Sequence, residues 1–159
     1  MQFRPAKEAD GAAIWAMLEP AFRAADSYAI DPGISRETAL DYWCGPAHRT
    51  WLAEDDAPCG TYYLRANQGG NGDHVCNAGF VTAPGATGRG VARAMLAHAL
   101  ETGREAGFAA MQFNCVVQTN TRAIDIWQRA GFDIIGRVPQ GFRHPQAGLV
   151  DALILHRML

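Results

Sequence analysis

The sequence lacks any apolar run long enough to cross a membrane. No stretch of its 159 residues approaches the roughly 20 consecutive apolar residues that a membrane-spanning helix needs. The first residues, MQFRPAKEADG, also lack the apolar core of a signal peptide. We therefore expect a soluble protein without a membrane partner.

Cysteine is scarce, and its spacing argues against two common kinds of site. Cys44, Cys59, Cys76 and Cys115 are far apart, with no CxxC pair and no disulfide framework. His74 and Cys76 would share a strand face, but no second pair at metal-binding spacing accompanies them, so we expect no metal site. Reduced thiols are typical of the cytoplasm, which is the location that we predict.

Charge is low and nearly balanced. The chain has 14 Lys and Arg against 16 Asp and Glu, and its net charge of -2 gives no general attraction to nucleic acid. With 48% hydrophobic residues and no internal repeat or low-complexity tract, the chain is long enough to bury one core. We predict a single domain over residues 1–159.

Apolar periodicity and turn residues predict an α+β fold. The expected order is strand, helix, helix, three strands, helix, strand, helix and two strands, which indicates a sheet flanked by helices. The strands are expected at residues 2–4, 50–54, 60–66, 74–82, 108–117, 132–138 and 148–158. Helices are expected around Ile14 and Leu18 and at residues 35–45, 90–106 and 120–130. The segment PQGFRHPQA, residues 139–147, is expected to be a loop.

The most informative junction is the glycine-rich turn at residues 85–90, between a strand and a helix. Such a turn presents several backbone N–H groups and the positive helix end to one point, which suits a phosphate or pyrophosphate. A P-loop would need Lys and Ser or Thr after Gly90, where Val91 and Ala92 stand. A Rossmann fingerprint would need a third glycine where Arg93 stands. Both alternatives fail, while a plain tight loop stays open.

The remaining pattern, GxGxA at a strand-to-helix junction, resembles the acetyl-CoA motif Q/R-x-x-G-x-G/A of the GNAT acetyltransferase superfamily. Here it reads TGRGVA, with Thr87 where Gln or Arg is usual. The opening FRPAKEADGAAI and the block N-x-x-A-x-x-x-W-x-x-x-GF at residues 120–132 extend the resemblance over nearly the whole chain. It implies a three-layer fold with a mixed, mostly antiparallel twisted sheet of about 6–7 strands and about 4 helices. It also implies acetyl-CoA as co-substrate and a possible homodimer.

The resemblance also assigns residues to acetyl-CoA. In the family, the strand before the glycine turn offers backbone N–H groups to the acetyl carbonyl and the pantetheine arm, and the turn holds the pyrophosphate. The residues implied are Phe80, Val81 and Thr82 on the strand, Thr87, Gly88, Arg89, Gly90, Val91 and Ala92 at the turn, and Asn120 beside the pantetheine arm. From the residues alone, Asn120 reads equally well as a plain helix N-cap.

The thiolate-protonating tyrosine of the family is replaced in this chain. The position of that tyrosine in the last helix is occupied by Trp127. The Trp127 indole N–H is a hydrogen-bond donor but not a practical proton source near neutral pH. The four tyrosines, Tyr28, Tyr42, Tyr62 and Tyr63, are substitutes in principle, and their spacing selects none of them.

A closer resemblance concerns the acceptor. The segments HVCNAGFVT, MQFNCVVQTNTRAIDIW and GFRHPQAGLVDALI are similar to the azetidine-2-carboxylate N-acetyltransferases, which acetylate small cyclic imino acids. This resemblance implies that Asn77 and Asn114 orient the substrate or the reacting groups. The alternative is that each Asn occupies a bulge or turn and bonds only to backbone. In the loop that follows, Arg143 and His144 could line the acceptor pocket, with Arg143 as a carboxylate partner.

The sequence therefore predicts a cytoplasmic, acetyl-CoA-dependent N-acetyltransferase. It would transfer the acetyl group directly, in a ternary complex, to the amine of a small amino or imino acid such as a proline analogue. One alternative is a GNAT transferase for another amine, such as a drug, a polyamine or a protein N-terminus. Another is a non-catalytic acyl-CoA-binding module. The residue that deprotonates the amine stays open.

Overall fold

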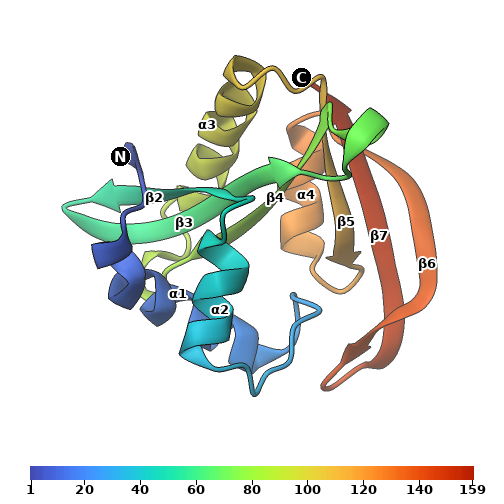
Figure 1. Ribbon diagram of the computed structural model, residues 1–159. Helices are drawn as coiled ribbons and strands as arrows, with labels where there is room; N and C mark the ends of the chain where they lie inside the picture. Colours follow the sequence, from blue (N-terminus) through green and yellow to red (C-terminus); the bar gives the residue numbers. More distant parts are fainter.

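A computed structural model describes residues 1–159 and contains one seven-stranded sheet (Figure 1). The strands are β1 (Gln2–Pro5), β2 (Arg49–Asp55), β3 (Ala57–Ala66), β4 (Val75–Thr82), β5 (Ala110–Val117), β6 (Asp133–His144) and β7 (Gly148–Met158). Their spatial order is β1-β2-β3-β4-β5-β7-β6. All neighbours are antiparallel except β4 and β5, which are parallel. The predicted α+β fold with a mixed, mostly antiparallel sheet is confirmed.

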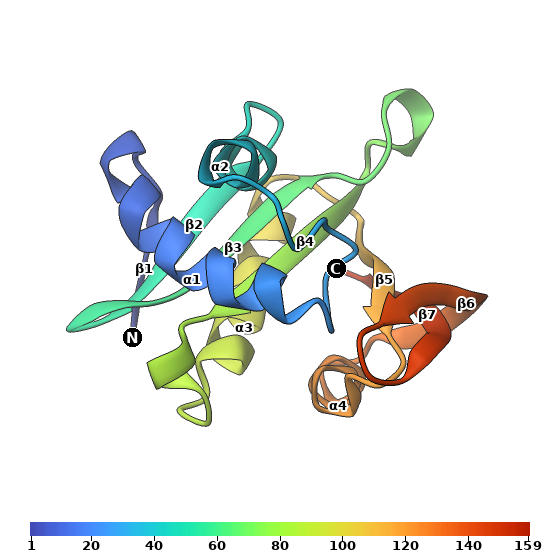
Figure 2. The same cartoon turned by 90° about the horizontal axis from the view of Figure 1, so that it is seen from below.

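Helices cover both faces of the sheet (Figure 2). They are α1 (Gly11–Ala24), α2 (Arg36–Cys44), α3 (Val91–Glu105) and α4 (Thr121–Arg129), with short 3-10 turns η1 (Glu8–Asp10), η2 (Gly70–Gly72) and η3 (Pro84–Ala86). The chain order of strands and α-helices is the predicted one. None of the helices combines the length and the apolar composition that a membrane crossing requires.

Local capping residues explain where two of the helices begin. Ser35 Oγ accepts a hydrogen bond from the Thr38 N–H at 3.1 Å at the start of α2. Asn120 Oδ1 accepts one from the Ala123 N–H at 3.2 Å at the start of α4. Each side chain satisfies a backbone donor that the first helical turn leaves free, so both predicted N-caps are confirmed.

Two hydrophobic cores lie on opposite faces of the sheet, and β3 contributes to both. Tyr62 and Leu64 are fully buried in the core beneath α3, whereas Tyr63 belongs to the core beneath α1 and α2. Successive side chains of a strand point to opposite faces, so a central strand covered by helices on both sides is apolar throughout. Strand β4 lies beside β3 and is the fourth of the seven strands across the sheet.

Strands β4 and β5 separate shortly after they begin to pair. Only Val75 with Ala110 and Cys76 with Met111 are in register. At the next position along β4, the Asn77 side-chain Nδ2 donates to the Gln112 carbonyl at 3.0 Å in place of a backbone bond. The sheet therefore opens from this point into a V-shaped gap, with the Asn77 amide at its vertex.

The prediction of a loop over residues 139–147 is wrong for most of that segment. Strand β6 continues to His144, and its register with β7 shifts between Val138 and Phe142. Pro139, which has no N–H, falls within the shift, and Gln140 adopts a left-handed φ of 52° there. A bulge thus absorbs the residues that looked like a loop, and only residues 145–147 form the turn.

Candidate active site

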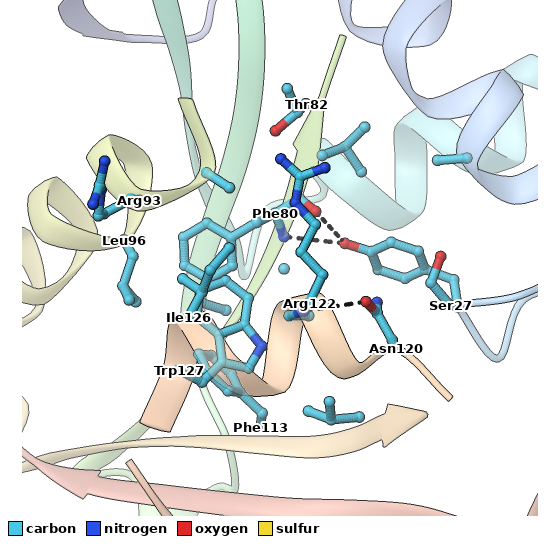
Figure 3. A pocket seen from close by; sticks show the side chains of 18 of the residues that line it. Ser27, Phe80, Thr82, Arg93, Leu96, Phe113, Asn120, Arg122, Ile126 and Trp127 are labelled. Atoms are coloured by element: carbon cyan, nitrogen blue, oxygen red, sulfur yellow. Dashed lines mark hydrogen bonds between the residues drawn. The ribbon is translucent and has the colours of Figure 1, made fainter. Parts of the chain in front are cut away.

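A cleft of about 1020 Å³ passes through the gap between β4 and β5. It reaches from the glycine turn before α3 to the connection between α1 and α2, and α4 forms one wall. Figure 3 shows side chains from α3, β4, β5 and α4 around this space. Of the 37 lining residues, 23 are hydrophobic, so the polar groups in the lining are few and their positions are informative.

The glycine turn forms one end of the cleft. Gly88 and Gly90 have φ values of 86° and 80°, and Gly90 is the N-cap of α3 in a left-handed conformation. Residues other than glycine rarely adopt these φ angles, which accounts for glycine at both positions. Thr87, Val91 and Ala92 line the cleft beside them. The turn leaves backbone N–H groups at the positive end of a helix, where an anion is stabilised.

The arginines near the turn differ in position. Arg89, predicted to assist the cofactor, forms an ion pair with Asp55 on β2 and does not line the cleft. Arg93, in the first turn of α3, does line it. A further arginine, Arg122, extends from the first turn of α4 into the cleft (Figure 3) and was not predicted. The sequence signal for Arg122 was its position two residues after the Asn120 cap, because residues in the first turn of a helix lie beside its N-terminus.

The β4 residues Phe80, Val81 and Thr82 line the cleft. The Phe80 N–H donates to the Tyr28 hydroxyl at 3.1 Å, and that hydroxyl donates to the Phe80 carbonyl at 2.7 Å (Figure 3). Burial raises the pKa of Tyr28 well above its ordinary value, so the phenol is neutral. Tyr28 therefore occupies both hydrogen-bonding groups of Phe80 on the side that faces the gap.

The two asparagines predicted as site residues both line the cleft. Asn77 is 6% exposed and accepts a hydrogen bond from the Tyr63 hydroxyl at 3.3 Å, besides its bond to the Gln112 carbonyl. Asn114 is exposed, accepts from Gln112 Nε2 at 2.9 Å and donates to Asn67 Oδ1 at 2.6 Å. Asn114 also lies where β5 shifts register against β7, which explains an Asn within a strand.

Helix α4 and its N-cap carry two further residues of the family motif, Asn120 and Trp127. Asn120 caps the helix and lines the cleft with the same side chain. Trp127 is 8% exposed and packs on Phe80 and Phe113, with ring centroids 5.3 and 5.1 Å apart. Trp127 is thus an apolar wall of the cleft and part of the core beneath α3.

The four tyrosines that the sequence left open are now separated. Tyr28, Tyr42 and Tyr63 line the cleft. Tyr62 points to the opposite face of the sheet, where its hydroxyl bonds to His98 Nδ1 at 2.5 Å. Tyr62 is therefore excluded as a proton donor at this cleft.

Besides Arg89, two further predicted residues lie outside the cleft. Arg143 is exposed on β6, and His144 Nδ1 accepts from the backbone N–H groups of Gln146 and Ala147 in the following turn. Neither residue is part of the lining. Arg65 on β3 does line it, and sequence reasoning missed it. The signal was its place two residues after Tyr63, which puts a charge on a face that β3 otherwise buries.

Comparisons with known proteins agree with this geometry. A sequence model described as the acetyltransferase (GNAT) family matches residues 12–132. The N-acetyltransferase aca1 of Schizosaccharomyces pombe is 32% identical over 146 residues, covering 80% of this chain and 70% of that protein. A GCN5-related N-acetyltransferase from Kribbella flavida is 40% identical, with a TM-score of 0.93 and coverage of 99% of this chain and 97% of that one. A phosphinothricin acetyltransferase from Sinorhizobium meliloti, solved with acetyl-CoA, has a TM-score of 0.86 at 20% identity and covers 99% and 88% of the two chains, which shows a shared fold.

Proposed function

Because the chain belongs to the GNAT family of acetyltransferases and uses acetyl-CoA as its co-substrate, we propose that its acceptor is the amine of a small amino or imino acid, such as the proline analogue azetidine-2-carboxylate. The observation that carries this proposal is the chemistry of the lining between β3, β4 and β5. The polar side chains there are two amides, one phenol, one hydroxyl, one thiol and one arginine, from Asn77, Asn114, Tyr63, Thr82, Cys115 and Arg65. The sole acidic residue of the lining, Asp125, is paired with Arg129 on α4. A cleft that binds polycationic acceptors such as polyamines is expected to contain unpaired carboxylates in its lining.

The reaction needs no nucleophile from the protein. The neutral acceptor nitrogen attacks the thioester carbon, the N–C bond forms and the C–S bond breaks. The proton that the nitrogen then loses balances the one that the CoA thiolate takes up. Burial raises the pKa of both Tyr28 and Tyr63 far above neutrality, so these phenols donate hydrogen bonds and do not act as bases. We infer that water in the open cleft removes the proton from the acceptor ammonium.

The assay that tests the proposal follows thiol release from acetyl-CoA. We expect release with L-azetidine-2-carboxylate or proline-like acids, and little with spermidine, an aminoglycoside or a peptide N-terminus. Release confined to one of the latter amines would refute the acceptor class and leave the acetyltransferase activity intact. Acetyl-CoA binding without release across the whole panel would favour a non-catalytic acyl-CoA-binding module.

We predict that Tyr28→Phe binds acetyl-CoA more tightly than the wild-type chain. The family uses β4 N–H groups for the acetyl carbonyl, and the Tyr28 hydroxyl competes for the Phe80 N–H. Removing one such hydrogen bond, worth about 1 kcal/mol, should lower the Kd about fivefold in calorimetry. Tyr42→Phe is the matched control, since the Tyr42 hydroxyl lies in the same cleft but bonds to Tyr63 at 3.5 Å. Weaker binding by Tyr28→Phe alone would mean that the phenol itself contacts the cofactor.

We further propose that the protein acts in the cytoplasm and forms a homodimer. All four cysteines are free thiols, which supports a reducing compartment. The β6–β7 hairpin exposes Ile135, Leu149 and Val138 by 57%, 50% and 45%, which supports an apolar contact with a second copy. Sedimentation at micromolar concentration tests the dimer, and a monomer throughout would refute it.

A further inference from the structure

Three side-chain nitrogens in this protein are buried without a hydrogen-bond partner, one on Arg65, which lines the cleft, and two on His48, which packs against the cleft residue Tyr63. They are Nε of Arg65 and both ring nitrogens of His48. His48 packs against Tyr63, two residues before Arg65 on the same face of β3, and burial, followed by the charge of Arg65, lowers the pKa of His48. Buried polar atoms in folded proteins are almost always paired, so this neighbourhood calls for an explanation.

Arg65 lies on the sheet face that α1 and α2 cover. It is in register with Asn77 on β4, beside the vertex of the gap. None of the seven ion pairs of the protein includes Arg65. The lining of the cleft therefore contains a guanidinium to which the protein supplies no counter-charge.

The chemistry of a guanidinium selects its ligand. Its planar fork of N–H donors matches the two oxygens of a carboxylate, and it keeps its charge at any physiological pH. The Tyr42 hydroxyl lines the same cleft, 3.5 Å from the Tyr63 hydroxyl, and can supply an uncharged donor. His48 packs edge-on against Tyr63, with ring centroids 4.7 Å apart, and its lowered pKa keeps it from adding a competing positive charge.

We propose that Arg65 binds the carboxylate of the acceptor, which must therefore be an amino or imino acid with a free carboxyl group. The inference rests on the proposed function and narrows it, because the same amine carrying a carboxamide becomes a poor acceptor. It also moves carboxylate recognition from Arg143, where the sequence suggested it, to a residue in the cleft. The Asn77 amide, one strand away, lies between this charge and the widening gap where the amine would react.

The test compares acids with their carboxamides in the thiol-release assay. L-azetidine-2-carboxylate and proline are each paired with the corresponding carboxamide. We expect the wild-type chain to prefer the acids by about 30- to 100-fold in kcat/KM, as for a charge-assisted bidentate contact. Arg65→Gln should lose most of this preference through slower turnover of the acids, while turnover of the carboxamides changes less than about threefold. Arg65→Lys should restore part of the preference.

Two controls accompany the comparison. Arg49→Gln removes an exposed arginine from the neighbouring strand β2, outside the cleft, and should leave the preference for acids unchanged. Calorimetry with acetyl-CoA should give the same Kd for every variant, since Arg65 is assigned to the acceptor.

The possible failures are distinguishable. An equal loss on acid and carboxamide in Arg65→Gln would overturn the role of Arg65 and leave the proposed function standing. Wild-type turnover of amines without any preference for acids would overturn both. If neither the acids nor the carboxamides are acetylated, the proposed acceptor class fails. The role of Arg65 is then tested by the change in melting temperature of the CoA complex when each acid or carboxamide is added. Stabilisation by the acids that Arg65→Gln abolishes would support it, and no selectivity would overturn it.

Discussion

Asn77→Ala is expected to lower kcat/KM for the acceptor by at least about 100-fold, equivalent to about 3 kcal/mol of transition-state stabilisation. The side chain holds β4 to the Gln112 carbonyl at the point where β5 departs, and it faces the cleft from there. Its loss removes a polar group from the lining of the cleft. It also removes the side-chain hydrogen bond that joins β4 to β5 where the two strands separate. Misplacement of a reacting group by even about 1 Å can cost as much as about 100-fold in rate.

Trp127→Phe serves as the comparison, because Trp127 occupies the slot of the family tyrosine. Its contacts are with the rings of Phe80 and Phe113, and a phenylalanine keeps an aromatic wall there. We expect activity within about threefold of wild type and a loss of stability of about 1–2 kcal/mol from the smaller volume. A large loss of turnover in Trp127→Phe with near-normal turnover in Asn77→Ala would contradict the assignment of both residues.

Unfolding of Asn77→Ala could imitate a catalytic defect, so stability is measured in parallel. The variant leaves the Tyr63 hydroxyl and the Gln112 carbonyl without their Asn77 partner, which should cost about 1–3 kcal/mol. Acetyl-CoA binding should change little, since the glycine turn is at the other end of β4. A variant that binds acetyl-CoA normally and fails to turn over places the defect at the acceptor.

The chain order and the helix starts were predictable from the sequence because their causes are local. Ser35 and Asn120 cap the helices that directly follow them, and the left-handed glycines of the turn lie between one strand and one helix. Such features depend on residues within one turn of each other, so a single sequence contains the information. Thr87, Gly88 and Gly90 of the glycine turn were found in the lining of one cleft with the β4 residues and both asparagines.

The missed features depend on pairing between distant segments. The extension of β6 to His144 requires a bulge against β7, and the ion pair of Arg89 requires the β2–β3 hairpin to lie beside the glycine turn. Arg65 reaches the cleft only because β4 and β5 separate next to it, which no local pattern encodes. The sequence placed Arg143 in a loop, whereas its long-range register with β7 places it on an exposed strand.

Gly88→Val is expected to weaken acetyl-CoA binding about 30- to 100-fold, as for the loss of one charge-assisted hydrogen bond from the turn to a phosphate. Gly88 lines the cleft at φ 86°, and a Cβ added there would meet no protein atom within 4 Å. The added Cβ therefore meets no protein atom, while the branched side chain lies where we expect the phosphates to approach the backbone.

Valine substitutions at two other glycines serve as controls that distinguish blocked phosphate binding from backbone strain. Gly107 has nearly the same φ, 85°, and equally open surroundings, but lies outside the cleft, so Gly107→Val should show the same loss of stability with an unchanged Kd. Gly85 lies in the same turn, outside the cleft lining and without a positive φ, so Gly85→Val should leave both quantities nearly unchanged. Calorimetry and thermal unfolding of the three variants distinguish the causes. If Gly88→Val and Gly107→Val lost stability equally and both bound acetyl-CoA normally, the turn would be a tight loop and the cofactor's phosphates would lie elsewhere.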